Sequence, residues 1–96
     1  MRVLIAEDEY CSRLNLIRQV KECIPFAPEE ILEAENGKEA WEIFLEKRPE
    51  LVLTDIRMPV LTGLELTEMI YKSQIPANVI IVSGFAEFEY AQKAMG

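Results

Sequence analysis

The sequence predicts an α/β protein with a parallel β-sheet and helices packed on both of its faces. Short runs rich in Val, Ile and Leu end abruptly in polar residues at 2–6, 51–53 and 79–82. Runs that are apolar at successive positions are typical of strands buried on both faces. Between them lie longer segments whose apolar residues recur at helical spacing. Strict alternation of strand and helix implies a doubly wound sheet of parallel strands.

Eight elements are expected, a strand followed by a helix, four times over. The strands are residues 2–6, a weaker run at 31–34, and residues 51–53 and 79–82. Pro25 and Pro49 end the first two helices because proline is unfavourable inside a helix. The apolar stripes of the four helices are Leu14, Ile17, Val20 and Ile24; Ala40, Trp41, Phe44 and Leu45; Leu64, Thr67, Ile70 and Tyr71; and, from Ala86 onward, Tyr90, Ala91 and Ala94.

These stripes are expected to pack against the sheet, with Leu14, Ile17, Trp41 and Phe44 in the core. A doubly wound domain of this kind usually has five strand–helix units, whereas residues 1–96 supply four. We therefore expect one domain, residues 1–96, that is incomplete at its C-terminus. Its fourth strand would form an exposed apolar edge, which favours a homodimer formed by edge contact or by domain swapping.

Composition excludes several classes of protein. The net charge is −7, from 17 acidic and 10 basic residues, and no cluster of Lys and Arg indicates a nucleic-acid surface. Cys11 and Cys23 would lie ~18 Å apart on one helix, too far for a disulfide, so we expect buried free thiols. Neither a signal peptide nor a run of roughly 20 apolar residues is present, so we expect a soluble, cytoplasmic protein without membrane contact.

Acidic residues directly follow two of the predicted strands. In an open α/β sheet, ligands bind outside the carboxyl ends of the strands, where the strand order reverses. In the flavodoxin-like order 2-1-3-4-5 this crevice lies between the first and third strands, which would bring Glu7, Asp8 and Asp55 together. Three crowded carboxylates repel unless a cation neutralises them, and Mg²⁺ prefers such hard oxygen ligands.

The same crevice suits a phosphoryl group. Asp55, at the end of a strand, is placed to attack phosphorus as a carboxylate nucleophile. Ser83, at the tip of the fourth predicted strand, is placed to donate a hydrogen bond to a phosphoryl oxygen. Two simpler interpretations stay open: the acids at 7–9 stabilise the N-terminus of the following helix, and Ser83 belongs to an ordinary loop.

Four segments resemble the response-regulator receiver domains of bacterial two-component systems. They are residues 3–9 (VLIAEDE), 34–40 (AENGKEA), 55–63 (DIRMPVLTG) and 79–84 (VIIVSG). They occur in the order and at the spacing typical of that family, over the whole chain. The resemblance implies a flavodoxin-like fold, with four of the usual five strand–helix units and the strand order 2-1-3-4.

The resemblance also implies roles for individual residues. Asp55 would accept a phosphoryl group from a sensor histidine kinase, and Ser83 would be the switch hydroxyl. Glu7, Asp8 and Asp55 would bind Mg²⁺ together with the backbone carbonyl of Arg57. Residues 83–91 further resemble receivers joined to AraC-type DNA-binding domains. The parent protein would then regulate transcription through an output domain, and only that domain would contact DNA.

Two departures from the family pattern matter. Glu7 stands where the family usually has aspartate. The lysine at the end of the fifth strand, and the aromatic residue just before it, are not among these 96 residues. Because losing one preorganised contact to a transferring group costs on the order of 10²–10³ in rate, we expect slow phosphorylation of this chain.

The leading hypothesis is a phosphorylation-controlled signalling domain that is not an enzyme, since it transfers a phosphoryl group only to its own Asp55. The alternative is a degenerate receiver that acts only as an interaction or dimerisation module and does not need Mg²⁺. A haloacid-dehalogenase-like phosphatase would need a second aspartate where Arg57 stands. Nucleotide-binding glycine motifs are absent from the sequence.

Overall fold

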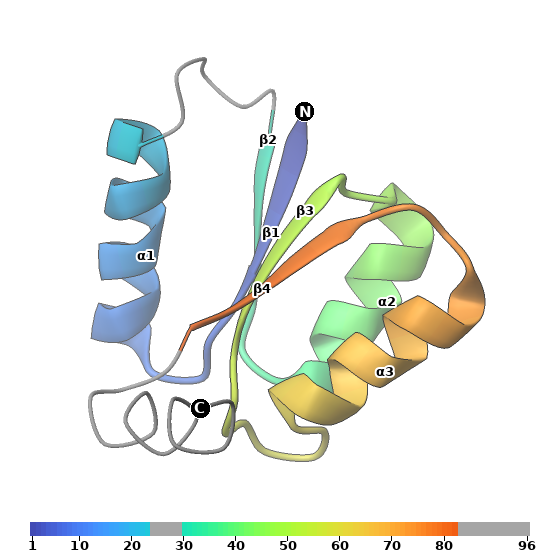
Figure 1. Ribbon diagram of the computed structural model, residues 1–96. Helices are drawn as coiled ribbons and strands as arrows, with labels where there is room; N and C mark the ends of the chain where they lie inside the picture. The colour runs from blue at the N-terminus through green and yellow to red at the C-terminus, as the bar shows by residue number, and fades with distance from the viewer. Residues whose placement is uncertain (24–29, 83–96) are drawn as a thin grey trace, which may run out of the picture.

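The computed structural model describes residues 1–23 and 30–82 of the chain. Within them, four parallel strands form one sheet in the order β2-β1-β3-β4. Helix α1 covers one face of this sheet, and α2 and α3 cover the other (Figure 1). The elements in chain order are β1 (Arg2–Ala6), α1 (Tyr10–Cys23), β2 (Glu30–Ala34), α2 (Gly37–Lys47), β3 (Leu51–Asp55), α3 (Gly63–Ser73) and β4 (Asn78–Val82).

This arrangement confirms the predicted flavodoxin-like fold and the strand order 2-1-3-4. Strand β3 is longer than predicted, because Thr54 pairs with Ala6 of β1 and Asp55 pairs with Val82 of β4. Asp55 is therefore the last residue of a central strand. The predicted fourth helix and Ser83 lie within residues 83–96, outside the described part of the chain.

The buried residues form one cluster on each face of the sheet. Because successive residues of a strand point to opposite faces, Leu4 and Ala6 pack with α2 and α3, whereas Val3 and Ile5 pack with α1. Both faces of β1 are thus apolar, which explains its continuous hydrophobic run. The α2–α3 cluster contains Leu4, Ala6, Ala34, Ala40, Phe44, Val52, Met58, Leu66 and Ile70, and the α1 cluster contains Val3, Ile5, Leu16, Val20 and Leu53.

The predicted core face of α1 is correct at Ile17 and Val20 and wrong at Leu14, and Ile24 lies outside the described residues. Leu14 is 44% exposed, whereas Arg13, Leu16 and Val20 are buried. Ile17 belongs to both possible stripes and packs against the α1 cluster, as predicted. Sequence reasoning missed Arg13 as a buried position because a core-facing stripe is recognised by its hydrophobic residues, and this stripe begins with an arginine.

The predicted core face of α3 is correct at Ile70 and wrong at Leu64 and Tyr71. Tyr71 is 84% exposed and Leu64 is exposed as well, whereas Leu66 and Ile70 are buried. Apolar residues lie on both sides of this helix, so that spacing alone allows either face to be chosen. Only the packing of α3 against the sheet decides between them.

The prediction for α2 is largely correct. Phe44 is fully buried and stacks on Trp41, with ring centroids 5.9 Å apart. The helix starts at Gly37 because the side chain of Asn36 accepts a hydrogen bond from the backbone N–H of Glu39 at 2.8 Å. This cap fixes the end of the β2–α2 connection, which lies beside the carboxyl edge of the sheet (Figure 1).

Both cysteines lie on α1, as predicted, but the expectation of buried thiols is wrong for Cys11. Cys11 is a free, exposed cysteine in the first turn of the helix. Among the described residues, no helix has the length and hydropathy needed to span a membrane.

Candidate functional site

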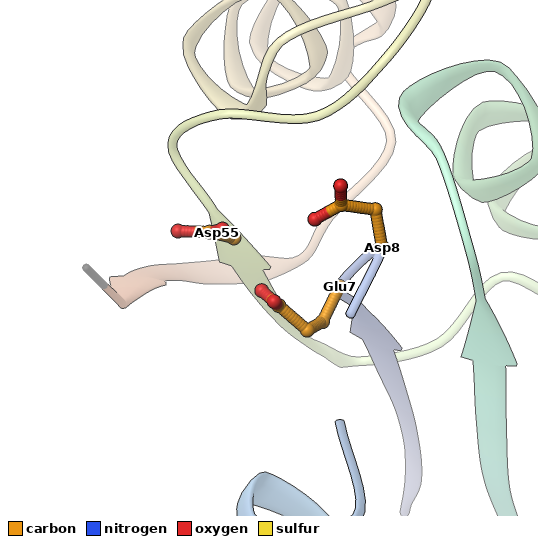
Figure 2. A group of neighbouring side chains, drawn as sticks. All are labelled: Glu7, Asp8 and Asp55. Carbon is orange, nitrogen blue, oxygen red and sulfur yellow. The ribbon is translucent and has the colours of Figure 1, made fainter. Parts of the chain in front are cut away.

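Three carboxylates meet at the carboxyl edge of the sheet, where β1 and β3 end side by side (Figure 2). Glu7 and Asp8 directly follow β1, and Asp55 ends β3. Each residue offers a carboxylate oxygen, and these three oxygens lie within 4.8 Å of one another. The structure therefore brings together the three acids that the sequence placed at the reversal of strand order.

These acids differ in exposure, and the difference sets their electrostatics. Glu7 is only 6% exposed, Asp55 is half-buried, and Asp8 is exposed. Burial raises the pKa of Glu7 to about 7, and Asp55 adds to this shift through a hydrogen bond and through its negative charge. Below about pH 7, Glu7 thus holds a proton that a bound cation would displace.

This donor set fits Mg²⁺. Magnesium binds hard oxygen ligands and is often held by one or two carboxylates with several waters. Burial first, and then the neighbouring Asp55, raise the pKa of Glu7, and a bound cation would favour its ionised form. Arg57, whose backbone carbonyl the resemblance implicates, lies in the β3–α3 loop two residues after Asp55, and its side chain is exposed.

The end of β3 is held in place by contacts with the start of α3. One carboxylate oxygen of Asp55 accepts a hydrogen bond from the backbone N–H of Ile56 at 2.8 Å. The N–H of Gly63 donates to the carbonyl of Ile56 at 2.8 Å, and the hydroxyl of Thr54 donates to the carbonyl of Asp55 at 3.0 Å. A Cβ at Gly63 would overlap the carbonyl oxygen of Asp55, so only glycine allows this approach.

We expect Glu7 to make folding stability depend on pH. Its pKa is about 7 in the folded protein and 4.5 ordinarily, so the folded state holds an extra proton between these values. This contribution to stability is complete below about 4.5 and is lost as the pH rises to about 7. The free energy of unfolding, measured in urea for wild type and Glu7→Gln, should show a difference that declines through this window and then levels off. A difference independent of pH would contradict the raised pKa.

A comparison with family models decides the classification. The model described as "Response regulator receiver domain" matches residues 3–96. The chain belongs to the response regulator receiver family. The predicted resemblance is thereby confirmed; receiver domains generally bind Mg²⁺ at an acidic pocket, and Glu7, Asp8 and Asp55 form an acidic cluster in this chain.

Curated relatives of this receiver domain include transcriptional regulators. It is 37% identical over 94 residues to the uncharacterized transcriptional regulatory protein YesN of Bacillus subtilis, covering 98% of this chain and 25% of that protein. It is 38% identical over 92 residues to the transcriptional regulatory protein HptR of Staphylococcus aureus, covering 93% and 34%. The chain spans about a quarter to a third of the length of these relatives.

Solved structures agree with this assignment. A two-component transcriptional regulator AraC from Clostridium phytofermentans superposes with a TM-score of 0.78 at 35% identity, covering 94% of this chain and 72% of that chain. A LuxR-family DNA-binding response regulator from Staphylococcus aureus superposes with a TM-score of 0.79 at 33% identity, covering 98% and 77%. The receiver fold is thus shared with regulators of both the AraC and LuxR families.

One residue beside the site was missed by sequence reasoning. Arg13 is buried on α1, and its guanidinium donates a hydrogen bond to the backbone carbonyl of Glu7 at 2.9 Å. The available signal was a charged residue in the helical series 13, 16, 17 and 20, whose other members are apolar. An arginine in a sheet-facing stripe needs partners, because an unpaired buried charge is costly.

Proposed function

We propose that this receiver domain accepts a phosphoryl group on Asp55 from a phosphohistidine of a sensor histidine kinase. The observation that carries the proposal is the convergence of Glu7, Asp8 and Asp55 at the reversal of strand order, with Asp55 at the end of a central strand. The Mg²⁺ ion that the transfer requires would be held by these three carboxylates and by the backbone carbonyl of Arg57.

The transfer is a displacement at phosphorus. A carboxylate oxygen of Asp55 forms a bond to phosphorus while the bond between phosphorus and the imidazole nitrogen breaks, and the electron pair of that bond stays on the imidazole. When bound, Mg²⁺ supplies positive charge that offsets the repulsion between the carboxylates and the phosphoryl oxygens. Ser83 donates a hydrogen bond to a phosphoryl oxygen of the product. The domain modifies only itself and is not an enzyme in the usual sense.

The state of Asp55 controls the rest of the protein. Since the relatives YesN and HptR are named as transcriptional regulators, phosphorylation of this domain regulates transcription in the cytoplasm through a DNA-binding output domain. Residues 1–96 act as one receiver unit. A homodimer formed at the β4 edge stays a prediction from the sequence.

Intact mass spectrometry tests the proposal. The protein is incubated with Mg²⁺ and a small acyl phosphate donor, next to Asp55→Asn and a sample in which a chelator replaces Mg²⁺. We expect one added phosphoryl group on wild type and none in either control. An equal addition to Asp55→Asn would refute the assignment of the acceptor. No addition, together with no binding of Mg²⁺ in a titration, would favour an interaction module without phosphotransfer.

A further inference from the structure

Arg13 contacts three residues in two segments with its three guanidinium nitrogens. Nη1 donates to the backbone carbonyl of Glu7 at 2.9 Å, and Nε donates to Oε1 of Glu33 on β2 at 3.0 Å. Nη2 lies 3.8 Å from Oε1 of Glu35, just after β2. The guanidinium carbon also lies 5.4 Å from the centre of the Tyr10 ring. Arg13 is 6% exposed, whereas the side chains of Glu33 and Glu35 are 47% and 70% exposed, so only the arginine side of these ion pairs is desolvated.

The contacts of Arg13 fix the turn that carries two of the three site carboxylates. The N–H of Glu7 donates to the carbonyl of Ala34 at 3.0 Å, and the carbonyl of Glu7 accepts from Arg13. Both backbone polar groups of Glu7 are therefore bound, one to the end of β2 and one to α1. Asp8 follows directly, so the position of its Cα depends on the same two bonds.

This turn needs support because Asp8, and Glu7 once it has lost its proton, both repel Asp55. Glu7 and Asp8 both lie close to Asp55, and the turn would relieve the repulsion by moving away from β3. Magnesium demands near-ideal octahedral geometry, so a displaced turn weakens its binding more than it weakens binding of the more tolerant Ca²⁺. Glu33 and Glu35 balance the charge of Arg13. Arg13 therefore affects the metal site through where its guanidinium is held, and not through its net charge.

We propose that Arg13 is a positioning residue, whose bond to the Glu7 carbonyl and pairing with Glu33 hold the Glu7–Asp8 turn in the geometry that binds Mg²⁺. This inference rests on the metal site of the proposed function. It assigns Arg13 no contact with the metal or the phosphoryl group. A residue behind a metal ligand typically changes metal affinity by about 10–100-fold when it is replaced.

The test compares binding of Mg²⁺ and Ca²⁺ by calorimetry in wild type, Arg13→Met and Arg13→Lys. The matched control is Arg2→Met, because Arg2 makes similar contacts at the opposite end of the sheet. Its Nη1 donates to the carbonyl of Lys47 at 2.9 Å, and its Nε lies 3.5 Å from Oε1 of Glu30. Circular dichroism establishes that each variant is folded at the temperature of the titration. Arg13→Lys keeps the positive charge, and it provides the comparison with wild type if Arg13→Met does not fold.

We expect Mg²⁺ affinity to fall by about 10–100-fold in both Arg13 variants, with a smaller loss for Ca²⁺ and no loss in Arg2→Met. A simple effect of charge has the opposite sign, because removing a cation near three carboxylates would tighten Mg²⁺ binding in Arg13→Met. Unchanged or tighter Mg²⁺ binding, or equal losses for the two ions, would overturn the positioning role. A wild type that binds no Mg²⁺ would overturn the metal site and this inference together.

Discussion

Replacing Gly63 by alanine is expected to lower the free energy of unfolding by about 3 kcal/mol, the upper range for overpacking a well-packed site. Gly63 is the first residue of α3, and a Cβ there would overlap the carbonyl oxygen of Asp55 and lie 2.9 Å from its carbonyl carbon. Neither atom can rotate away, since both belong to the backbone of β3. The helix or the strand end must therefore move, and Asp55 moves with it.

Urea unfolding measures this effect as a lower midpoint with an unchanged slope. Leu64→Ala is the matched control, because Leu64 is the next residue on α3 and is exposed. A surface substitution of that kind usually changes stability by only about 0.5 kcal/mol. If the urea midpoint of Gly63→Ala equals that of wild type, then α3 and β3 approach less closely than the structure shows.

Replacing Asp8 by asparagine is expected to weaken Mg²⁺ binding by at least about 10–100-fold, because a direct ligand matters no less than the residues behind it. The carboxylate of Asp8 is one of the three whose oxygens lie within 4.8 Å of one another. Asp8 is exposed, so the substitution removes a charge without opening a cavity and should leave the fold intact. A calorimetric Mg²⁺ titration measures the change directly.

Glu9→Gln is the control for the loss of one negative charge. Glu9 is adjacent to Asp8, but its carboxylate accepts hydrogen bonds from the backbone N–H groups of Cys11 at 3.2 Å and Ser12 at 2.7 Å. It thus caps α1 and is not part of the acidic cluster. Equal losses of affinity in the two variants would indicate that Mg²⁺ responds only to net charge, and would contradict a site built from Asp8.

The pattern of the sequence was sufficient to predict the sheet, because strands buried on both faces give continuous apolar runs, and a helix between successive strands makes them parallel. It was not sufficient to orient α1 and α3. Leu14 and Tyr71 fit a helical stripe as well as the buried residues do, yet both are exposed. Choosing the face of such a helix requires its packing partners, and these lie far away in the sequence.

The sequence also predicted the site only as far as strand order determines it, and it did not predict contacts with distant residues. The three carboxylates follow strand ends, and their meeting follows from strand order alone. The role of Arg13 depends on Glu33, twenty residues away, and on the backbone of Glu7. The need for glycine at 63 depends on how closely α3 approaches the end of β3. The spacing of residues marks Arg13 only as a charged member of an apolar helical series, and it gives no signal for the contact at Gly63.

The most direct test of the central claim is to locate the phosphoryl group chemically. Borohydride reduces an aspartyl phosphate to homoserine, and peptide mass spectrometry identifies the position. After treatment with Mg²⁺ and an acyl phosphate donor, we predict homoserine at position 55 and at no other aspartate, because Asp55 alone ends a central strand beside Glu7 and Asp8. Homoserine at position 8, or phosphorylated protein without homoserine at position 55, would contradict the account.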